Sequence, residues 1–203
     1  MEKTLLRKSA SVNLLGKAVI PEGTEQIGYR AFAENGRLRT VILPESVKDI
    51  ASDAFRACPN LQSVTLPEGL QSIGPAAFSD RVQLTELTLP DGLQNMDGAN
   101  FCNMAGLRRP IYNASGTALC HYPCGLEAPV FTVPEVVRKL CPSAFRDNPH
   151  LQEVILPEGM ERVHSGAFWG SSIRRITIPK SVKRIEERAF FCCESLEEVM
   201  VLG

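Results

Sequence analysis

The chain has 203 residues, of which 44% are hydrophobic and 22% are charged, and its formal net charge is −1. This composition is typical of a folded globular protein, and a net charge so close to zero creates no long-range field that would favour nucleic acid or an anionic membrane. No apolar run approaches the ~18–20 residues that are needed to span a bilayer.

The first residues match the rest of the chain poorly. The segment "MEKTLLRKSASVNLL" contains basic residues but no apolar core, so we do not expect it to act as a secretory signal. Residues 1–14 are interpreted as an N-terminal cap or a truncated repeat.

From residue 15 onward the chain repeats itself. Near-copies of one motif stand at 41–55 ("VILPESVKDIASDAF"), 64–78 ("VTLPEGLQSIGPAAF") and 154–168 ("VILPEGMERVHSGAF"). The prolines and the phenylalanines of the motif are both spaced by 23, 23, 23, 44, 23 and 22 residues. They are Pro21, Pro44, Pro67, Pro90, Pro134, Pro157 and Pro179, and Phe32, Phe55, Phe78, Phe101, Phe145, Phe168 and Phe190. Two markers that keep one period indicate a structural repeat.

Each column of the repeat has a physical role. In "TVILP" (40–44) the valine and the leucine alternate with threonine and isoleucine, as in a strand with one buried face. The proline has no N–H to donate, so it ends this V-x-L strand. A return leg then carries Val47 and Ile50, and Ala54 and Phe55 fill the gap between neighbouring coils.

One repeat cannot bury its apolar face alone, so stacked repeats must share a continuous core. With one V-x-L strand in each repeat, the sequence predicts that these strands lie side by side in one parallel sheet. We expect them around residues 18–20, 41–43, 64–66, 87–89, 131–133, 154–156, 176–178 and 199–201, with a further strand near 109–112.

The columns L-x-x-V-x-L-P-x-x-L-x-x-I-x-x-x-A-F resemble leucine-rich repeats, and the style of "LPEGLQSIGPAAF" is similar to the BspA-like leucine-rich repeats. The resemblance covers about residues 15–201. It implies a leucine-rich repeat solenoid, a right-handed coil with a parallel sheet on its concave face and short 3-10, turn and extended segments on its convex side. It also implies a non-enzymatic bacterial protein that binds a host or matrix protein at the cell surface.

We expect a single solenoid domain over residues 1–203, with regular repeats in 15–107 and 130–203 and no obvious C-terminal cap. The stretch 108–129, "RRPIYNASGTALCHYPCGLEAP", breaks the pattern. Its turn signal Ser115–Gly116 stands between two runs of strand formers, which predicts a hairpin or a hairpin-like coil. Further on, the segment "WGSSIRR" (169–175) is one residue short of the repeat.

Candidate chemistry is sparse. The seven cysteines, an odd number, are expected to be free thiols. In "CHYPC", residues Cys120, His121 and Cys124 offer one ligand pair where zinc usually takes two, so we predict no metal site and prefer a hairpin strand with mixed faces. No nucleophile or nucleotide motif is present, so no catalytic residue and no cofactor are predicted.

Two other sets of residues are expected to be structural or solvated. Three residues after the repeated phenylalanines stand Asn35, Cys58, Arg81, Met104, Asn148, Ser171 and Cys193, and we expect the small polar groups among them to bond turn backbone. The basic residues Arg162, Arg174, Arg175, Lys183 and Arg184 are interspersed with glutamates and read as a solvated face, not as a phosphate track.

The remaining candidates point outward from the V-x-L strands. They are Thr40, Ile42, Ser63, Thr65, Glu86, Thr88, Thr132, Glu153, Ile155, Arg175 and Thr177. Strand preference alone accounts for the threonines; the functional alternative is an extended surface that docks a protein partner. A second hypothesis is a structural or self-associating solenoid, because the final strand "VMVLG" leaves an edge that invites end-to-end association.

Overall fold

The computed structural model describes residues 5–6, 12–80, 83–85, 87–101, 103–104 and 106–203. The chain divides into two compact units, Met1–Arg109 and Pro110–Gly203. The boundary lies inside the stretch 108–129, where the sequence breaks the repeat. Each unit is a β-solenoid and is described by itself; that residues 1–203 behave as one domain stays a prediction.

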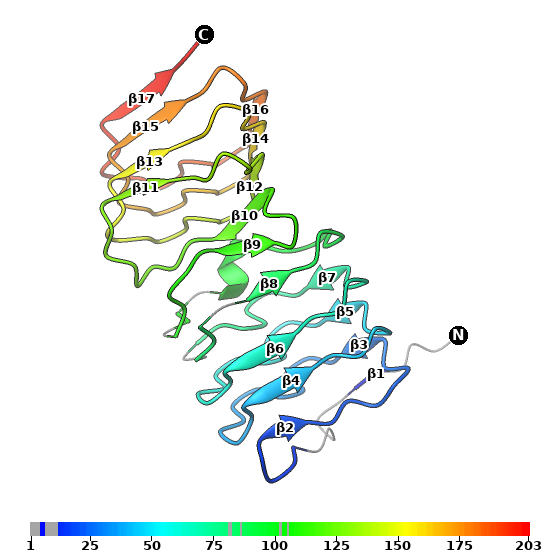
Figure 1. Ribbon diagram of the computed structural model, residues 1–203. Helices are drawn as coiled ribbons and strands as arrows, with labels where there is room; N and C mark the ends of the chain where they lie inside the picture. The colour runs from blue at the N-terminus through cyan, green and yellow to red at the C-terminus, as the bar shows by residue number, and fades with distance from the viewer. Residues whose placement is uncertain (1–4, 7–11, 81–82, 86, 102, 105) are drawn as a thin grey trace. The chain divides into compact units, whose positions relative to one another are not determined.

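The V-x-L strands pair in parallel, as the repeat predicts, but they form one sheet in each unit and not the single continuous sheet that the sequence predicts (Figure 1). In the first unit they are β2 (Lys17–Ala18), β4 (Thr40–Ile42) and β6 (Ser63–Thr65). Strand β8 (Thr88–Leu89) carries the same sequence pattern one repeat later but, contrary to the prediction, does not belong to this sheet. In the second unit they are β11 (Val130–Thr132), β13 (Glu153–Ile155), β15 (Arg175–Ile178) and β17 (Glu198–Val201). Thr40 lies opposite Ser63 and Val130 opposite Glu153, so one turn of the coil equals one repeat.

The sequence predicts a single sheet, but the return legs also pair. They form short parallel strands, because stacked extended segments satisfy one another's backbone groups. In the first unit these are β1 (Leu5–Leu6), β3 (Gln26–Ile27), β5 (Asp49–Ile50) and β7 (Ser72–Ile73). In the second unit they are β10 (Ala118–His121), β12 (Lys139–Leu140), β14 (Arg162–Val163) and β16 (Arg184–Ile185). Each coil of this kind therefore has two sheet-forming sides.

Ladders of stacked aromatic rings run through the core of both units. Phe55 stacks on Phe32 at a centroid distance of 5.1 Å and an interplanar angle of 6°. In the second unit Phe145 stacks on Phe168 at 4.9 Å and 1°. Offset parallel stacking is a favourable arrangement for such rings, and the separation is close to the strand spacing of about 4.8 Å. Each regular coil therefore contributes one ring to the ladder.

The corners on either side of these rings use left-handed backbone. Asp53 and Ala57, two residues before and two after Phe55, have φ angles of 55° and 54°. The same two positions are left-handed at Arg30, Glu34, Ala76, Asp80, Asn103, Ser143, Asp147, Gly166, Gly170, Arg188 and Cys192. Since most of these residues are not glycine, this conformation could not be predicted from the sequence.

The irregular stretch 108–129 contains the predicted hairpin. Strand β9 (Ile111–Asn113) pairs antiparallel with β10, and β10 then pairs parallel with β12 as a return-leg strand. Tyr122 takes the place of the missing phenylalanine: its N–H donates to Ala144 O over 2.7 Å, as the N–H of Phe145 donates to Ala167 O. The expected mixed faces are wrong, because all four residues of β10 are buried.

The repeat that contains "WGSSIRR" (169–175) is one residue shorter than the others, and the difference lies at one corner of its coil. Ser171 is equivalent to Asn148, and Ile173 is equivalent to Leu151. Leu151 follows Asn148 by three residues, whereas Ile173 follows Ser171 by two, so the missing residue lies between these positions. All four side chains are buried. Strand register is restored directly afterwards, where Arg175 lies opposite Glu153.

The first unit also contains one 3-10 turn, η1 (Gly98–Phe101), as expected of the side opposite the V-x-L strands. In the part of the chain that the structure describes, no helix combines the length and apolar character that a membrane crossing requires.

Candidate functional site

The outward face of the V-x-L strands is the surface that the sequence predicts for binding. In the first unit, strand alternation buries Val41 and leaves Ile42 47% exposed, with Ser63 and Thr65 exposed on the next strand. Thr40 is half-buried. Thr88 is exposed on β8, and Glu86 lies outside the described residues.

In the second unit the same face carries two cross-strand rows. One row runs Val130, Glu153, Arg175 and Glu198, and the other runs Thr132, Ile155, Thr177 and Met200. The first row alternates in charge, and Arg175 Nε lies 3.9 Å from Glu198 Oε2. In the second row Ile155 is 43% and Met200 48% exposed. The predicted residues of this unit, Thr132, Glu153, Ile155, Arg175 and Thr177, therefore share one surface.

Sequence reasoning missed two apolar residues beside this set. Val130, 47% exposed, stands opposite Glu153 in the first row, and Val19, 54% exposed, directly follows β2. Val130 could have been predicted from the sequence. It stands directly before Phe131, which occupies the inward position of its strand, just as Thr40 stands directly before the inward residue Val41. Exposed apolar residues on a polar sheet face favour contact with another protein.

The cysteine and asparagine column is structural, as predicted. Asn148 Oδ1 accepts hydrogen bonds from the N–H groups of His150 and Leu151, and Asn35 does the same for the two equivalent groups of its own coil. The Cys58 thiol donates to Phe32 O over 3.0 Å, and burial raises the pKa of this thiol to about 11. A thiol of this kind serves packing and not reactivity.

The "CHYPC" residues do not converge on a metal site. Cys120 is buried with its sulfur 3.5 Å from the sulfur of Cys141. The Cys124 thiol instead donates to Arg146 O over 3.4 Å. Across the described ranges, no three His, Cys, Asp or Glu side chains are grouped so that they could hold a metal ion.

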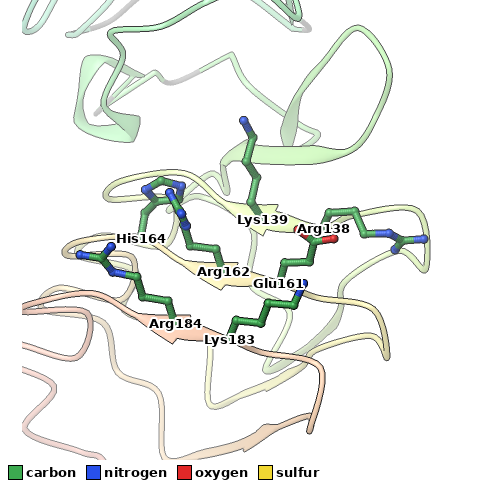
Figure 2. A pocket seen from close by; sticks show the side chains of 7 residues that line it. All are labelled: Arg138, Lys139, Glu161, Arg162, His164, Lys183 and Arg184. Atoms are coloured by element: carbon green, nitrogen blue, oxygen red, sulfur yellow. The ribbon is translucent and has the colours of Figure 1, made fainter.

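A basic surface lies on the return-leg strands of the second unit. We call it the basic face; Arg138, Lys139, Arg162, Lys183 and Arg184, together with Glu161 and His164, line an open hollow of about 300 Å³ there (Figure 2). Figure 2 shows the head of Arg138 turned away from the other side chains; it donates to the backbone carbonyls of Glu135 and Val137.

The carboxylate of Glu186 lies close to three side chains of the basic face. Glu186 Oε1 lies 3.8 Å from Arg162 Nη1 and 4.0 Å from Arg184 Nε, while Glu186 Oε2 lies 3.3 Å from His164 Nδ1. Burial lowers the pKa of His164, and the field of Glu186 opposes this shift only in part. The sequence places Arg162, Lys183 and Arg184 on a solvated face, which is correct, but it does not group them with Arg138 and Lys139.

Comparison with known proteins identifies the repeat. The profile of the BspA type leucine rich repeat region matches residues 10–123 and 117–202 in six copies. Comparison with curated proteins finds no relative of this chain.

Solved structures share the fold. A leucine-rich repeat protein from Eubacterium ventriosum matches with a TM-score of 0.57 at 19% identity, over 92% of this chain and 60% of that one. The pneumococcal vaccine antigen PcpA matches with a TM-score of 0.54 at 20% identity, over 89% and 55%. A leucine-rich repeat protein from Bacteroides ovatus matches with a TM-score of 0.52 at 21% identity, over 91% and 54%. This chain thus spans 54–60% of the length of these three proteins.

At these identities the structural likeness concerns the fold alone, whereas the repeat profile covers nearly the whole sequence. The resemblance seen in the "LPEG" and "AF" columns is thereby confirmed, and so is the leucine-rich repeat solenoid. The chain belongs to the BspA-type leucine-rich repeat family.

Proposed function

We propose that the chain is a non-enzymatic interaction module that binds a partner protein through the outward face of its V-x-L strands. The observation that carries the proposal is the pair of rows in the second unit, where Ile155 and Met200 stand exposed among threonines and beside alternating charges. A surface with a few apolar anchors and a polar surround resembles the composition of protein interfaces. Repeat solenoids commonly offer such extended surfaces.

The surface suits a protein better than a nucleic acid or a stacked sugar. The two rows contain no aromatic side chain, so they offer no platform for base or sugar stacking. Glu153 and Glu198 flank Arg175, and this alternation discourages a polymer of uniform charge. A partner with mixed polar and apolar side chains matches this pattern.

The experiment compares two substitutions that are matched in residue type and exposure. Ile155, 43% exposed, lies on the proposed surface, and Ile185, 42% exposed, lies on the return-leg strand β16 of the same unit. Wild type, Ile155→Lys and Ile185→Lys are immobilised, and proteins retained from the native extracellular environment are compared by quantitative mass spectrometry. A partner retained by wild type and Ile185→Lys, but lost from Ile155→Lys, supports the proposal. Equal retention by all three proteins contradicts it.

A cell-surface setting is the finer part of this proposal. It is supported by family membership and by the fold shared with a protein described as a pneumococcal vaccine antigen. Antibody labelling of intact producing cells tests it, with permeabilised cells as the control. Labelling only after permeabilisation would contradict a surface location.

Self-association is a second candidate function, favoured by the exposure of β17. Val199, Met200, Val201 and Leu202 are between 40% and 66% exposed, and β17 pairs only with β15 among the described residues. An apolar strand edge of this kind can pair with another chain. Sedimentation velocity over a wide concentration range tests this; a single monomeric species throughout would exclude it.

A further inference from the structure

The basic face presents a row of cations that the proposed function does not use. Lys139 lies directly opposite Arg162, and Arg162 lies opposite Arg184, on three neighbouring parallel strands. The side chains of Arg162 and Arg184 are 48% and 67% exposed. Figure 2 shows these three side chains rising from adjacent strands, with Lys183 and Glu161 beside them.

This arrangement is unfavourable for the fold itself, because like charges directly opposite one another on neighbouring strands are destabilising. Glu186 is shared between Arg162 and Arg184, and no carboxylate of the described residues lies within ion-pair distance of Lys139. Five basic side chains against Glu161 and Glu186 leave a formal charge of +3 here, although the whole chain carries −1.

The solenoid does not require cations at this position. In the first unit the equivalent row on the return-leg strands is Gln26, Asp49 and Ser72, which are uncharged or acidic. There the Ser72 hydroxyl donates to Asp49 Oδ1 over 2.6 Å, so neighbouring coils support each other. The same fold thus has a self-satisfied row in one unit and, in the other, a row of three cations whose charge Glu186 compensates only in part. We therefore infer that the cations of the basic face serve to bind a ligand.

We propose that the basic face binds an acidic helical segment of a partner protein. The spacing of the cations supports a helix: neighbouring strands lie about 4.8 Å apart, and side chains at i and i+4 of a helix lie about 5–6 Å apart. Alternate side chains on one face of an extended peptide are separated by about 6.6 Å, which matches the row less well. Arginine guanidinium groups suit carboxylates because they can donate two parallel hydrogen bonds.

The chemistry of the face favours a protein over a polymer of uniform negative charge. Glu161 and Glu186 stand among the cations, so a sulfated polysaccharide or a nucleic acid would meet repulsion along the row. Among the described residues that line the hollow there is no Phe, Tyr or Trp, so bases find no large aromatic platform. In a helix with spaced glutamates and an occasional lysine, the glutamates can pair with the cations of the face and the lysine with its carboxylates.

The test uses a synthetic alanine-based helical peptide with glutamate at every fourth position, labelled for fluorescence anisotropy. We expect it to bind wild type, and to bind the double variant Arg162→Gln/Arg184→Gln at least about tenfold more weakly. Lys180→Gln, which removes one exposed charge elsewhere in the same unit, is the control and should bind within about twofold of wild type. Binding should weaken as salt rises from 0.1 to 1 M, because the screening length falls from about 10 to about 3 Å.

The double variant should fold normally, since it removes a like-charge contact, and an unchanged or higher melting temperature verifies this. No binding of the peptide at low salt would overturn the proposal, as would equal weakening by Lys180→Gln. Tighter binding of heparin or of an extended polyglutamate than of the helical peptide would also overturn it. Ile155→Lys should leave peptide binding unchanged, so the result is independent of the surface proposed for the V-x-L strands.

Discussion

The sulfur atoms of Cys120, on β10, and Cys141, directly after the neighbouring parallel strand β12, lie 3.5 Å apart. Both residues directly follow a buried leucine in matching register, Leu119 opposite Leu140. Residues facing each other on adjacent strands fall within the Cα separation of about 4.4–6.8 Å that a disulfide requires. This contact joins the irregular stretch to the first regular coil of the second unit.

Oxidation should link this pair. With oxidised glutathione as the acceptor, each bridge formed passes two electrons and the two thiol protons to the reagent, whose disulfide breaks and which leaves as two reduced thiols. The thiol–thiol hydrogen bond and burial raise the pKa of Cys120, so exchange should be slow and should speed up in mild urea. Closing a loop of this size should add about 3 kcal/mol to the free energy of unfolding.

Peptide mapping by mass spectrometry and urea denaturation measure both effects. Cys120→Ser and Cys141→Ser are the controls, because either change removes the bridge. Recovery of both thiols unbridged, after Cys192 at the surface has reacted fully, would contradict the prediction.

The phenylalanine ladder should dominate the stability of the first unit. Phe55 is fully buried and stacks on rings from both neighbouring coils. Phe55→Ala should lower the free energy of unfolding by about 3–5 kcal/mol, because it leaves a cavity between coils. Tyr29→Ala, at a position 64% exposed, should change it by less than about 1 kcal/mol. Urea denaturation followed by circular dichroism measures both values, and similar losses for the two variants would argue against the ladder.

The left-handed corners should resist β-branched side chains. Ala57 has a φ of 54°, where a valine meets added steric strain, whereas glycine is relaxed. We expect Ala57→Val to lower the free energy of unfolding by about 1–2 kcal/mol and Ala57→Gly to leave it nearly unchanged. Thermal unfolding of the three proteins decides this. A valine variant as stable as the wild type would mean that this backbone conformation is not required.

The burial of His164 should make stability depend on pH. Burial lowers the pKa of His164, so the unfolded chain binds the proton more readily than the folded chain. Stability from this site is therefore complete above a pH of about 6.5 and falls as the pH drops towards the folded pKa. Glu186 opposes this loss, while Arg162 and Lys139 add to it. His164→Gln should show a smaller difference between urea midpoints at about pH 5.5 and 7.5 than wild type; equal differences would exclude His164 as the source.

The fold was readable from sequence because its columns obey simple rules. Pro44 and Phe55 recur at a fixed period, and Val41 and Ile42 alternate between the core and the surface as strand geometry requires. The pairing of the return legs was not readable, because strands such as Asp49–Ile50 have two residues and show no alternation. The left-handed corners were hidden because alanine, aspartate and arginine stand where glycine would be the signal.

The candidate surfaces were predicted in part. The outward positions of the V-x-L strands follow from alternation, so Thr65 and Ile155 were found, whereas Val130 was overlooked beside an atypical Phe131. The basic face had a signal in the pairs "KL", "RV" and "RI" at 139–140, 162–163 and 184–185, each a cation before a buried or core-facing position. It becomes visible only when these pairs are aligned as strands of one sheet.

The corner between Ser171 and Ile173, where one coil is a residue shorter than its neighbour, marks a point at which chain length can vary without disturbing either sheet. Loop insertions at this corner would project from the coil while the strands on both sides kept their partners. The solenoid therefore offers a natural grafting point, at which an epitope or a reporter peptide could be displayed without redesigning the core.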